Sequence, residues 1–351
     1  MKRIQVTASK NYDVLVGREL LQELGVHIRT LTKASKVAII SDSNVWPIYG
    51  QLAVKSLEDA GFFGTVSYVF PAGEESKNGE TFLSLLNFLA TEKLTRSDCI
   101  VALGGGVVGD MTGFVAATYL RGIDYIQVPT TVLAAVDSSV GGKTAIDLPA
   151  GKNLAGAFYQ PKLVLCDIDT LDTLPEEVFR DGCAEIIKYG VLYDPQLFAH
   201  LQEHTMDFDR EAVIARCIEL KRNVVAADEF DRGERQKLNL GHTIGHSVEA
   251  NSNFTVSHGK AVAIGMAIVG RASAKQNICS AQTAAAIEDI LRKFSLPTDT
   301  ADSAAAIYEG ALSDKKRFGA NVNLIVPVRI GSCIIHTVTT EALKTFIEAG
   351  L

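Results

Sequence analysis

The chain has 351 residues, of which 47% are hydrophobic and 21% charged, and its formal net charge at pH 7 is −7. This length predicts two domains, and the composition is that of a folded globular protein, which excludes a disordered chain. The negative charge argues against a nucleic acid or an acidic membrane as partner, because both bind basic faces. A small anionic substrate stays compatible with it, because a single pocket can be basic on an acidic protein.

No segment predicts export or membrane insertion. The opening MKRIQVTASK lacks the apolar core of a signal peptide, and no run approaches the roughly eighteen apolar residues of a spanning helix. We therefore expect a cytoplasmic protein. In that setting the cysteines are expected to be reduced, mostly buried and without a role: Cys99, Cys166, Cys183, Cys217, Cys279 and Cys333.

Short apolar runs alternate with helical patterns in the first half of the chain. After a hairpin within residues 1–35, the expected strands are residues 36–40, 65–70, 99–103, 125–129 and 163–167. Helical stretches such as QLAVKSLEDAG and NGETFLSLLNFLATEKL lie between them. This alternation predicts a parallel sheet with helices on both faces, in an N-terminal domain of residues 1–171.

Long helical patterns dominate residues 172–351, the expected C-terminal domain. They include PEEVFRDGCAEIIKYGVL, DREAVIARCIELKRNVVAADE, HGKAVAIGMAIVGRASAKQN and SAQTAAAIEDILRKF. Thr173 is the expected N-cap of the first of them, with Pro175 in its first turn. VNLIVPVRIG and CIIHTV, near the end of the chain, predict a hairpin.

Polar or glycine-rich segments follow each expected strand of the sheet: SDSNV, PAGEESK, GGGVVGD, TTVLAAVDSSVGGKT and DIDTLDT. Ligands of doubly wound sheets bind at the carboxyl ends of the strands, so these segments are expected to converge. Gly104, Gly106 and Gly109 satisfy the G-x-G-x-x-G spacing, although on a middle strand. We interpret this loop as the pyrophosphate loop of a non-standard dinucleotide site, with tight helix–strand packing as the alternative.

Lysines lie beside glycines in two further segments. Lys143 lies in VDSSVGGKTAID, which also carries Asp137, and Lys152 lies in GKN. The placement of two lysines at one end of the predicted sheet favours contacts to an anion over solvated surface charges.

Histidines cluster in LNLGHTIGHSVEANSNFTVSHGK, where His242, His246 and His258 lie within seventeen positions. His242 and His246 share one face of a helix, and His258 can return to them only if the chain turns at ANSN. A catalytic zinc often has two histidines and a carboxylate as ligands. The best candidate for the carboxylate is Glu185, for which a buried ion pair with Lys188 is the alternative.

Signature segments of the 3-dehydroquinate synthase family, a branch of the sugar phosphate cyclases, resemble seven segments of this chain in the same order. These are GGGVVGD, YLRG, VPTTVLAAVDSSVGGKTAID, GKN, AEIIKYG, LNLGHTIGHSVEA and SHGKAVAIGM. The resemblance covers essentially the whole chain. It implies an N-terminal Rossmann-like NAD-binding α/β domain, a mainly α-helical metal-binding C-terminal domain, an active site between them, and a homodimer.

The resemblance also implies roles for individual residues. Glu185, His242 and His258 would bind one divalent metal, zinc or alternatively cobalt. Catalytic roles are implied for His246, Lys143, Lys188, Asn239 and Arg121. Substrate contacts are implied for Asp137, Lys152, Asn153, Lys221, Arg235 and one of Lys315 and Lys316. NAD contacts are implied for Asp42, Asn44, Gly73, Glu74, Lys77, Gly105, Gly106, Asp110, Thr130, Thr131, Lys143, Lys152, Thr170 and Thr173.

The reaction of this family is a phosphate-eliminating carbon–oxygen lyase reaction of the shikimate pathway, which leads to chorismate and the aromatic amino acids. Its substrate is 3-deoxy-D-arabino-heptulosonate 7-phosphate, and its products are 3-dehydroquinate and phosphate. Transient oxidation of the C5 alcohol by NAD⁺ acidifies the C6 proton, so that phosphate leaves. The hydride then returns, the ring opens and an intramolecular aldol reaction closes the carbocycle. A Lewis-acidic metal and a local pocket of cationic side chains suit this chemistry.

Three other functions stay open at this point. A sister cyclase would use sedoheptulose 7-phosphate or glucose 6-phosphate with the same NAD and zinc. A metal-dependent polyol dehydrogenase would accumulate NADH. A non-catalytic NAD- or metal-binding protein would show no activity that depends on Glu185 or His258.

Overall fold

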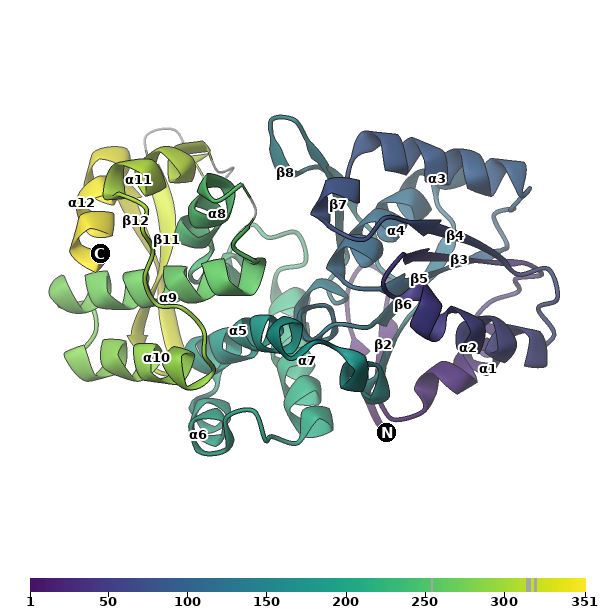
Figure 1. The fold of residues 1–351 in the computed structure, drawn as a ribbon, viewed down its shortest axis with the longest axis horizontal. Coiled ribbons are helices and arrows are strands. Elements are labelled where there is room, and N and C mark those ends of the chain that lie inside the picture. The colour runs from purple at the N-terminus through teal and green to yellow at the C-terminus, as the bar shows by residue number, and fades with distance from the viewer. Residues whose placement is uncertain (254, 314–316, 319–320) are drawn as a thin grey trace. The chain divides into compact units, whose positions relative to one another are not determined.

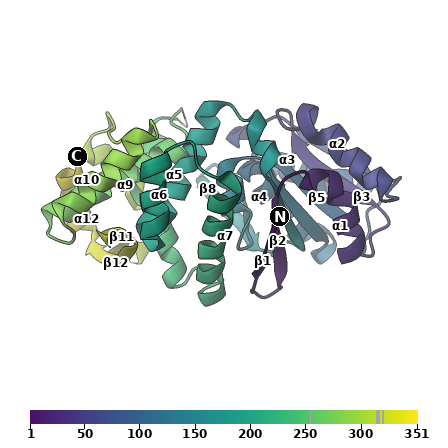
Figure 2. The same cartoon turned by 90° about the horizontal axis from the view of Figure 1, so that it is seen from below.

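The computed structural model of the chain describes residues 1–253, 255–313, 317–318 and 321–351 (Figure 1). Two compact units divide the chain: unit 1 is Met1–Leu174 with Arg210–Phe230, and unit 2 is Pro175–Asp209 with Asp231–Leu351. The sequence predicts a single boundary after residue 171. The structure places the first crossing after Leu174 and returns the chain to unit 1 for helix α7 (Arg210–Ala227). This helix packs against β1 (Lys2–Val6) and β2 (Tyr12–Gly17), beside which it lies in Figure 2, and against the short helix η4 (Ala134–Ser138), which explains its place in unit 1.

A seven-stranded sheet forms the centre of unit 1, in the order β1-β2-β9-β6-β5-β3-β4. Only β1 and β2 are antiparallel neighbours within it. The strands are β1 (Lys2–Val6), β2 (Tyr12–Gly17), β3 (Val37–Asp42), β4 (Val66–Phe70), β5 (Cys99–Gly104), β6 (Asp124–Pro129) and β9 (Leu163–Asp167). Besides α7, the helices of unit 1 are α1 (Leu24–Leu31), α2 (Trp46–Asp59), α3 (Gly79–Thr91), α4 (Gly106–Thr118), η1 (Leu20–Glu23), η2 (Glu74–Ser76), η3 (Tyr119–Arg121), η4 (Ala134–Ser138) and η5 (Ile168–Thr173).

All five strands predicted after residue 35 are present, which confirms the parallel sheet. The predicted N-terminal hairpin is β1–β2, but it does not stand apart from the sheet, because β2 pairs with β9 in parallel. Strands β7 (Lys143–Leu148) and β8 (Gly151–Phe158) form a separate antiparallel pair. The sequence predicts only a glycine-flanked loop there.

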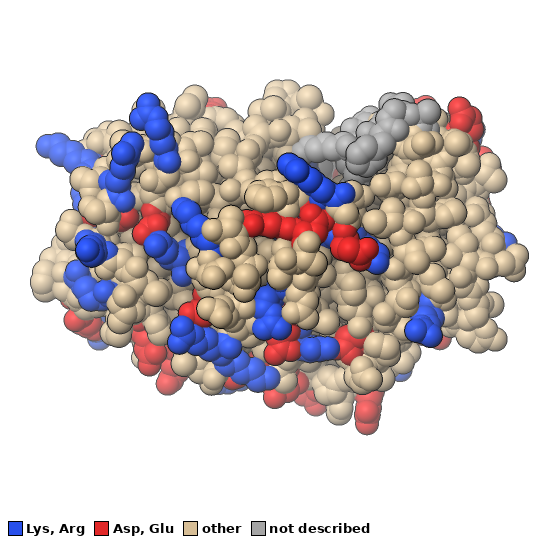
Figure 3. All heavy atoms as spheres, turned by 180° about the vertical axis from the view of Figure 1, so that it is seen from behind, with Lys and Arg blue, Asp and Glu red and all other residues tan. Residues whose placement is uncertain are grey.

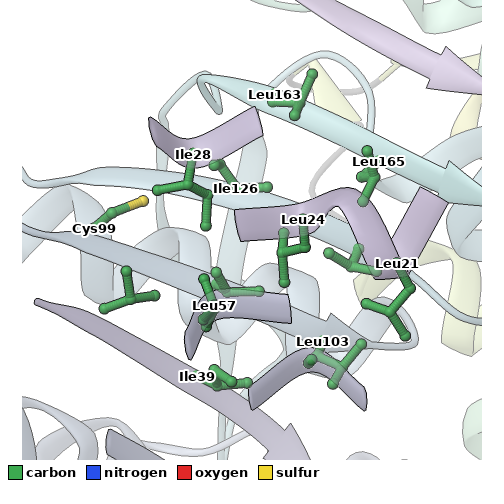
Figure 4. Close-up of a cluster of buried hydrophobic side chains, with 14 of the residues drawn as sticks. Leu21, Leu24, Ile28, Ile39, Leu57, Cys99, Leu103, Ile126, Leu163 and Leu165 are labelled. Atoms are coloured by element: carbon green, nitrogen blue, oxygen red, sulfur yellow. The ribbon is translucent and has the colours of Figure 1, made fainter. Parts of the chain in front are cut away.

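Alternate residues of each strand face opposite sides of the sheet, so one strand contributes to two cores. Ile39 packs in a cluster with Leu57 of α2 (Figure 4), while Ile40 packs with Leu85 of α3 and Val108 of α4. Each fully buried leucine or isoleucine contributes about 1.5–3 kcal/mol. Helices α1 and α2 therefore cover one face and α3 and α4 the other.

Asp98, just before β5, ties this strand to the segment before β3. Its carboxylate is 2% exposed. It accepts hydrogen bonds from Thr95 N and Oγ1 (both 2.8 Å), Ser35 Oγ (3.0 Å) and Lys36 N (2.9 Å). Burial raises the pKa of Asp98, but the hydrogen bonds from Thr95, Lys36 and Ser35 outweigh burial and hold the pKa below its usual value.

We expect the Asp98→Asn variant to lose about 1.5–3 kcal/mol of unfolding free energy at pH 7, the worth of hydrogen bonds to a charged group. A lowered pKa stabilises the fold fully above the unfolded value of about 3.9, and the effect disappears as the pH falls through the folded value. Urea unfolding at pH 7 and pH 3 should therefore show a deficit that shrinks in acid. Asn substitution at the exposed Asp59 is the control. A deficit of equal size at both pH values would contradict this role.

Unit 2 is mainly helical, as the sequence predicts. Helix α9 is its centre, with α5, α8, α10 and α12 packed on it. Its helices are α5 (Glu176–Tyr193), α6 (Pro195–His204), η6 (Glu234–Asn239), α8 (His242–Asn251), α9 (His258–Lys275), α10 (Ala281–Lys293), α11 (Ala304–Ser313) and α12 (Thr340–Gly350). Its strands are β10 (Arg317–Phe318), β11 (Asn321–Arg329) and β12 (Ser332–Thr339), and β11–β12 is the predicted late hairpin.

The prediction that Thr173 is the N-cap of α5 is wrong. Pro175 directly precedes the helix, and no side chain caps its first turn. The hydroxyl of Thr173 contacts the Tyr49 hydroxyl at 2.6 Å and Thr170 O at 3.3 Å, both in unit 1. The Thr173 side chain therefore bonds within unit 1 and does not cap α5.

Acidic and basic side chains both occur across the face shown in Figure 3. Among the described residues, no helix combines the length and the apolar character needed to cross a membrane. Four lysine or arginine side chains are buried in the part of the chain that the structure describes: Lys77, Lys188, Lys221 and Arg235. A buried charge is costly unless a charged partner or a ligand compensates it, so these four residues are candidates for ligand binding.

Candidate active site

Helix α5 carries the buried carboxylate of Glu185 and, one turn later, the buried ammonium of Lys188. Both side chains are about 1% exposed, and Glu185 Oε2 pairs with Lys188 Nζ. The other oxygen, Glu185 Oε1, lies 3.6 Å from His242 Nε2 and 3.6 Å from His258 Nε2. The buried ion pair with Lys188 is thus present, and the other oxygen of Glu185 faces both histidines, so the ion pair does not prevent a role as metal ligand.

The two histidines approach Glu185 from the first residues of α8 and α9. The chain turns back between residues 251 and 258, as predicted, and the ring centroids of His242 and His258 lie 5.3 Å apart. One ligand atom from each of Glu185, His242 and His258 lies within 4.8 Å of the other two. His246 lies on the same helix as His242, with its ring 5.3 Å from His242 and 6.0 Å from His258.

Glycines allow α8 and α9 to approach closely enough for this. A Cβ on Gly265 would lie 1.9 Å from the carbonyl oxygen of Gly241, and a Cβ on Gly245 would lie 2.8 Å from that of Ala261. Gly241 also has a φ of +78°, which favours glycine. Direct backbone contact between the helices therefore places the histidines together.

The donor set fits a divalent metal. A carboxylate and two imidazoles are the ligands of many catalytic zinc sites, in which a fourth position is left for water or substrate. Burial lowers the pKa of His258, but hydrogen bonds and charge attraction from Glu185 and Glu249 outweigh burial and raise the pKa to about 10. These carboxylates thus stabilise positive charge at His258, and a bound cation would supply that charge.

Asp181, also on α5, anchors the start of α9. Its carboxylate accepts hydrogen bonds from the Ser257 hydroxyl, from Gly259 N (3.1 Å) and from Lys260 N (2.9 Å). A Cβ on Gly259 would lie 1.9 Å from the carbonyl oxygen of Asp181. Close contact of α9 with α5 therefore sets the position of His258 relative to Glu185.

We expect Gly259→Ala to lower the unfolding free energy by about 1–3 kcal/mol, the usual cost of overpacking, and to weaken zinc binding because His258 moves. Urea unfolding and a zinc titration measure the two effects. Gly270→Ala in the same helix is a matched control, since its Cβ would meet no atom closer than 3.8 Å. Unchanged zinc affinity in Gly259→Ala would show that this contact does not position His258.

In unit 1, the carboxyl ends of the strands meet at one edge of the sheet, as predicted. The register pairs Asp42 with Phe70 and Gly104 with Pro129. The helices that follow β3 and β5 lie on opposite faces, so these neighbouring strands form a switch point, where doubly wound sheets bind ligands. Gly105 and Gly106 open helix α4 there, and its N-terminal N–H groups suit a phosphate.

Tight packing, the alternative for the glycine loop, accounts for two of its glycines. A Cβ on Gly104 would lie 2.7 Å from Val108 Cβ, and a Cβ on Gly109 would lie 2.7 Å from Gln127 Oε1. For Gly105 the nearest atom would be at 3.2 Å. The phosphate interpretation is therefore kept as a proposal for Gly105 and Gly106.

Lys77 is the centre of a polar cluster in unit 1. Its ammonium lies 2.7 Å from Asp110 Oδ2, 2.6 Å from Asn153 Oδ1 and 3.8 Å from Glu74 Oε1. Lys152 joins through Glu74 Oε1 at 3.4 Å. The structure thus brings together five residues that the sequence analysis assigned to NAD or substrate.

A second ion pair joins the buried Lys221 of α7 to the partly exposed Asp137 of η4, with Nζ 2.9 Å from Oδ1. Arg121 and Lys143 are exposed, and Arg121 has a φ of +66°. Lys315 and Lys316 lie outside the described residues.

The other expected site residues have the following local contacts. Asp42 Oδ1 accepts from Asn44 N at 2.9 Å, and Gly73 precedes Glu74 with a φ of +119°. Thr130 and Thr131 follow β6 directly, and the Thr170 carbonyl and Thr173 hydroxyl contact Tyr49. In unit 2, Arg235 is buried, and Asn239 Nδ2 donates to Gln236 O at 3.0 Å.

Comparison with known proteins places both units in one family. The family described as 3-dehydroquinate synthase N-terminal matches residues 67–181, and that described as 3-dehydroquinate synthase C-terminal matches residues 182–317. The chain is similar to the 3-dehydroquinate synthases of Clostridium perfringens (45% identity over 97% of this chain and 99% of the relative) and Picosynechococcus sp. (43%, 97% and 96%).

The chain belongs to the 3-dehydroquinate synthase family. Among solved structures it is similar to 2-deoxy-scyllo-inosose synthase complexed with carbaglucose-6-phosphate, NAD⁺ and Co²⁺ (TM-score 0.89, 26% identity, full coverage of both chains). An iron-containing alcohol dehydrogenase shares the fold alone, with a TM-score of 0.71, 16% identity and 99% coverage of both chains. The predicted Rossmann-like domain with a helical metal-binding domain is thereby confirmed as the fold class.

Two acidic residues beside the candidate metal ligands were not singled out from the sequence. Glu249 lies three positions after His246, and Asp181 lies four positions before Glu185. Helical spacing puts each on the same face as a predicted site residue. That spacing is the signal that would have found them, although it does not show what either carboxylate contacts.

Proposed function

We propose that this chain converts 3-deoxy-D-arabino-heptulosonate 7-phosphate to 3-dehydroquinate and phosphate, with NAD⁺ and one divalent metal, zinc or alternatively cobalt, as cofactors. The observation that carries the proposal is the convergence of Glu185, His242 and His258, next to the buried Lys188, in a member of this family. Glu185, His242 and His258 hold the metal in this proposal. Oxidation and re-reduction cancel, so the net reaction is an elimination of phosphate and a ring closure.

When bound, NAD⁺ supplies reversible acceptance of hydride, and a divalent metal supplies Lewis acidity toward an alcohol or ketone oxygen. The remaining tasks belong to the side chains of this chain. Lys188 and Arg235 are buried cations suited to the phosphate and carboxylate of the substrate, and we assign Lys221, held by Asp137, to the same task. This buried positive charge lets a protein whose net charge is −7 bind a substrate that carries two anionic groups.

His246 has a different proposed task from the other two histidines. It lies beside them without belonging to the set that includes Glu185. A neutral imidazole there can donate to or accept from a substrate hydroxyl and so move a proton. We assign Asn239, Arg121 and Lys143 to orientation of the substrate as well.

NAD binding is proposed for the strand-end residues and the Lys77 cluster. Gly105 and Gly106 would hold the pyrophosphate at the start of α4, and Asp42 and Asn44 would lie at the neighbouring strand end. The turn of Thr170 and Thr173 completes this set. We also propose that the protein is cytoplasmic, and that it is a homodimer, as the family resemblance implies. Light scattering after size-exclusion chromatography tests the homodimer.

The experiment is a phosphate-release assay with the purified protein, NAD⁺ and zinc, while absorbance at the NADH band is recorded. We expect phosphate equal to the heptulosonate substrate consumed and no net NADH. Accumulating NADH would indicate a polyol dehydrogenase. Phosphate release only from sedoheptulose 7-phosphate or glucose 6-phosphate would indicate a sister cyclase.

A further inference from the structure

Glu249 is a buried acidic residue that the proposed chemistry does not use. It lies on α8, seven positions after His242, and is 5% exposed. Its Oε2 lies 3.5 Å from His258 Nδ1. A carboxylate buried to this degree is costly unless it has a function or a charged partner.

The ring of His258 thus lies between two carboxylates that it meets through different nitrogens. Nε2 faces Glu185 Oε1 at 3.6 Å, and Nδ1 faces Glu249 Oε2 at 3.5 Å. A neutral imidazole has one lone pair and one N–H group. If Nε2 binds the metal, Nδ1 must carry the proton, and Glu249 is the acceptor for it.

His242 shows the same arrangement with a weaker acceptor. Its Nε2 lies 3.6 Å from Glu185 Oε1, and its Nδ1 lies 3.0 Å from the carbonyl oxygen of Leu240. Both histidines therefore present Nε2 to Glu185 and Nδ1 to an oxygen. Such an outer acceptor fixes the tautomer and the ring orientation, and a charged acceptor makes the imidazole a better donor to the metal.

The backbone next to His258 is held separately. Asp181 accepts from the N–H groups of Gly259 and Lys260, so the start of α9 is placed without Glu249. These backbone hydrogen bonds do not fix the rotation of the His258 ring. Glu249, from a different helix, is placed to determine that rotation.

We propose that Glu249 is a positioning residue that orients and polarises His258 for metal binding. This inference rests on the proposed metal site. The competing role is that of a ligand, because Glu249, His246 and His258 also have ligand atoms within 4.8 Å of one another. A neutral imidazole has one lone pair, so His258 cannot bind one metal through Nε2 beside Glu185 and a second metal through Nδ1 beside Glu249.

The test measures zinc affinity and stoichiometry, by competition with a chromophoric chelator, in the wild type, Glu249→Gln and Glu249→Asp. Gln keeps the shape and removes the charge, while Asp keeps the charge on a shorter side chain. We expect one zinc per chain in all three, about 10–100-fold weaker binding in Glu249→Gln, and partial recovery in Glu249→Asp. Cobalt absorption spectra should shift in Glu249→Gln, because the geometry around His258 changes.

Glu288→Gln is the matched control, since Glu288 is a largely buried carboxylate of the same unit that pairs with Arg271 at 2.6 Å. It should lower the melting temperature without changing zinc affinity. Equal zinc affinity in Glu249→Gln and wild type overturns the positioning role while leaving the metal site intact. Two zinc ions per wild-type chain, with one lost in Glu249→Gln, overturns it in favour of a ligand role. Failure of the wild type to bind zinc overturns the metal site itself.

Discussion

His242→Ala is expected to purify without stoichiometric zinc and to lose kcat/KM by about 10³-fold or more. Lewis-acid stabilisation is worth several kcal/mol, and each 1.4 kcal/mol corresponds to a factor of ten in rate. His242 contributes one of the three ligand atoms that converge in unit 2. The variant leaves the Glu185–Lys188 pair in place, so the loss of metal is not caused by an unpaired buried charge. Metal analysis of the purified protein and the phosphate-release assay measure the two losses.

His204→Ala provides the control for this experiment. His204 ends helix α6, and its side chain is 43% exposed. We expect this variant to keep zinc and activity. Normal zinc content in His242→Ala would disprove the ligand assignment, and normal activity without zinc would disprove the metal-dependent function.

Lys77→Met is expected to lower the unfolding free energy by about 3–5 kcal/mol, because it leaves the Asp110 carboxylate in a buried cluster without its cation. Lys77 is 4% exposed, and its ammonium contacts Asp110, Asn153 and Glu74. Burial lowers the pKa of Lys77, but the charges of Asp110 and Glu74 outweigh burial and hold the pKa above its usual value. A raised pKa stabilises the fold fully below the unfolded value of about 10.4, so the loss should appear at all pH values around neutrality.

NAD affinity should fall in the same variant, because Glu74, Lys77 and Asp110 are proposed cofactor contacts. Urea unfolding and calorimetric titration with NAD⁺ separate the two effects. Lys36→Met is the matched control: Lys36 pairs with Glu92 at 3.1 Å, but its side chain is 25% exposed, and such pairs contribute at most about 1 kcal/mol. A loss in Lys77→Met no greater than in Lys36→Met would contradict the structural role. Unchanged NAD affinity would contradict the cofactor role.

The parallel sheet could be predicted from the sequence because its central strands β3, β5, β6 and β9 are buried on both faces. Such strands appear as short runs of apolar residues, and β9 has the predicted bounds. Strand β8 was missed because its sequence, GKNLAGAF, gives no alternating apolar pattern and all eight of its residues are partly or fully exposed. The pairing of β2 with β9 was missed because nothing local records a contact between segments so far apart in the chain.

The sequence by itself determined which residues could form the metal site and which family the chain resembles. Residue type and local spacing carry that information, since two histidines one turn apart need no tertiary structure to share a helix face. Only the tertiary structure decided how these residues are used. Glu185 reaches both Lys188 and the histidines because a carboxylate has two oxygens, and α5, α8 and α9 meet at backbone contacts that only glycine permits. Only the tertiary structure connects Glu249 to His258, because their contact joins two different helices, α8 and α9.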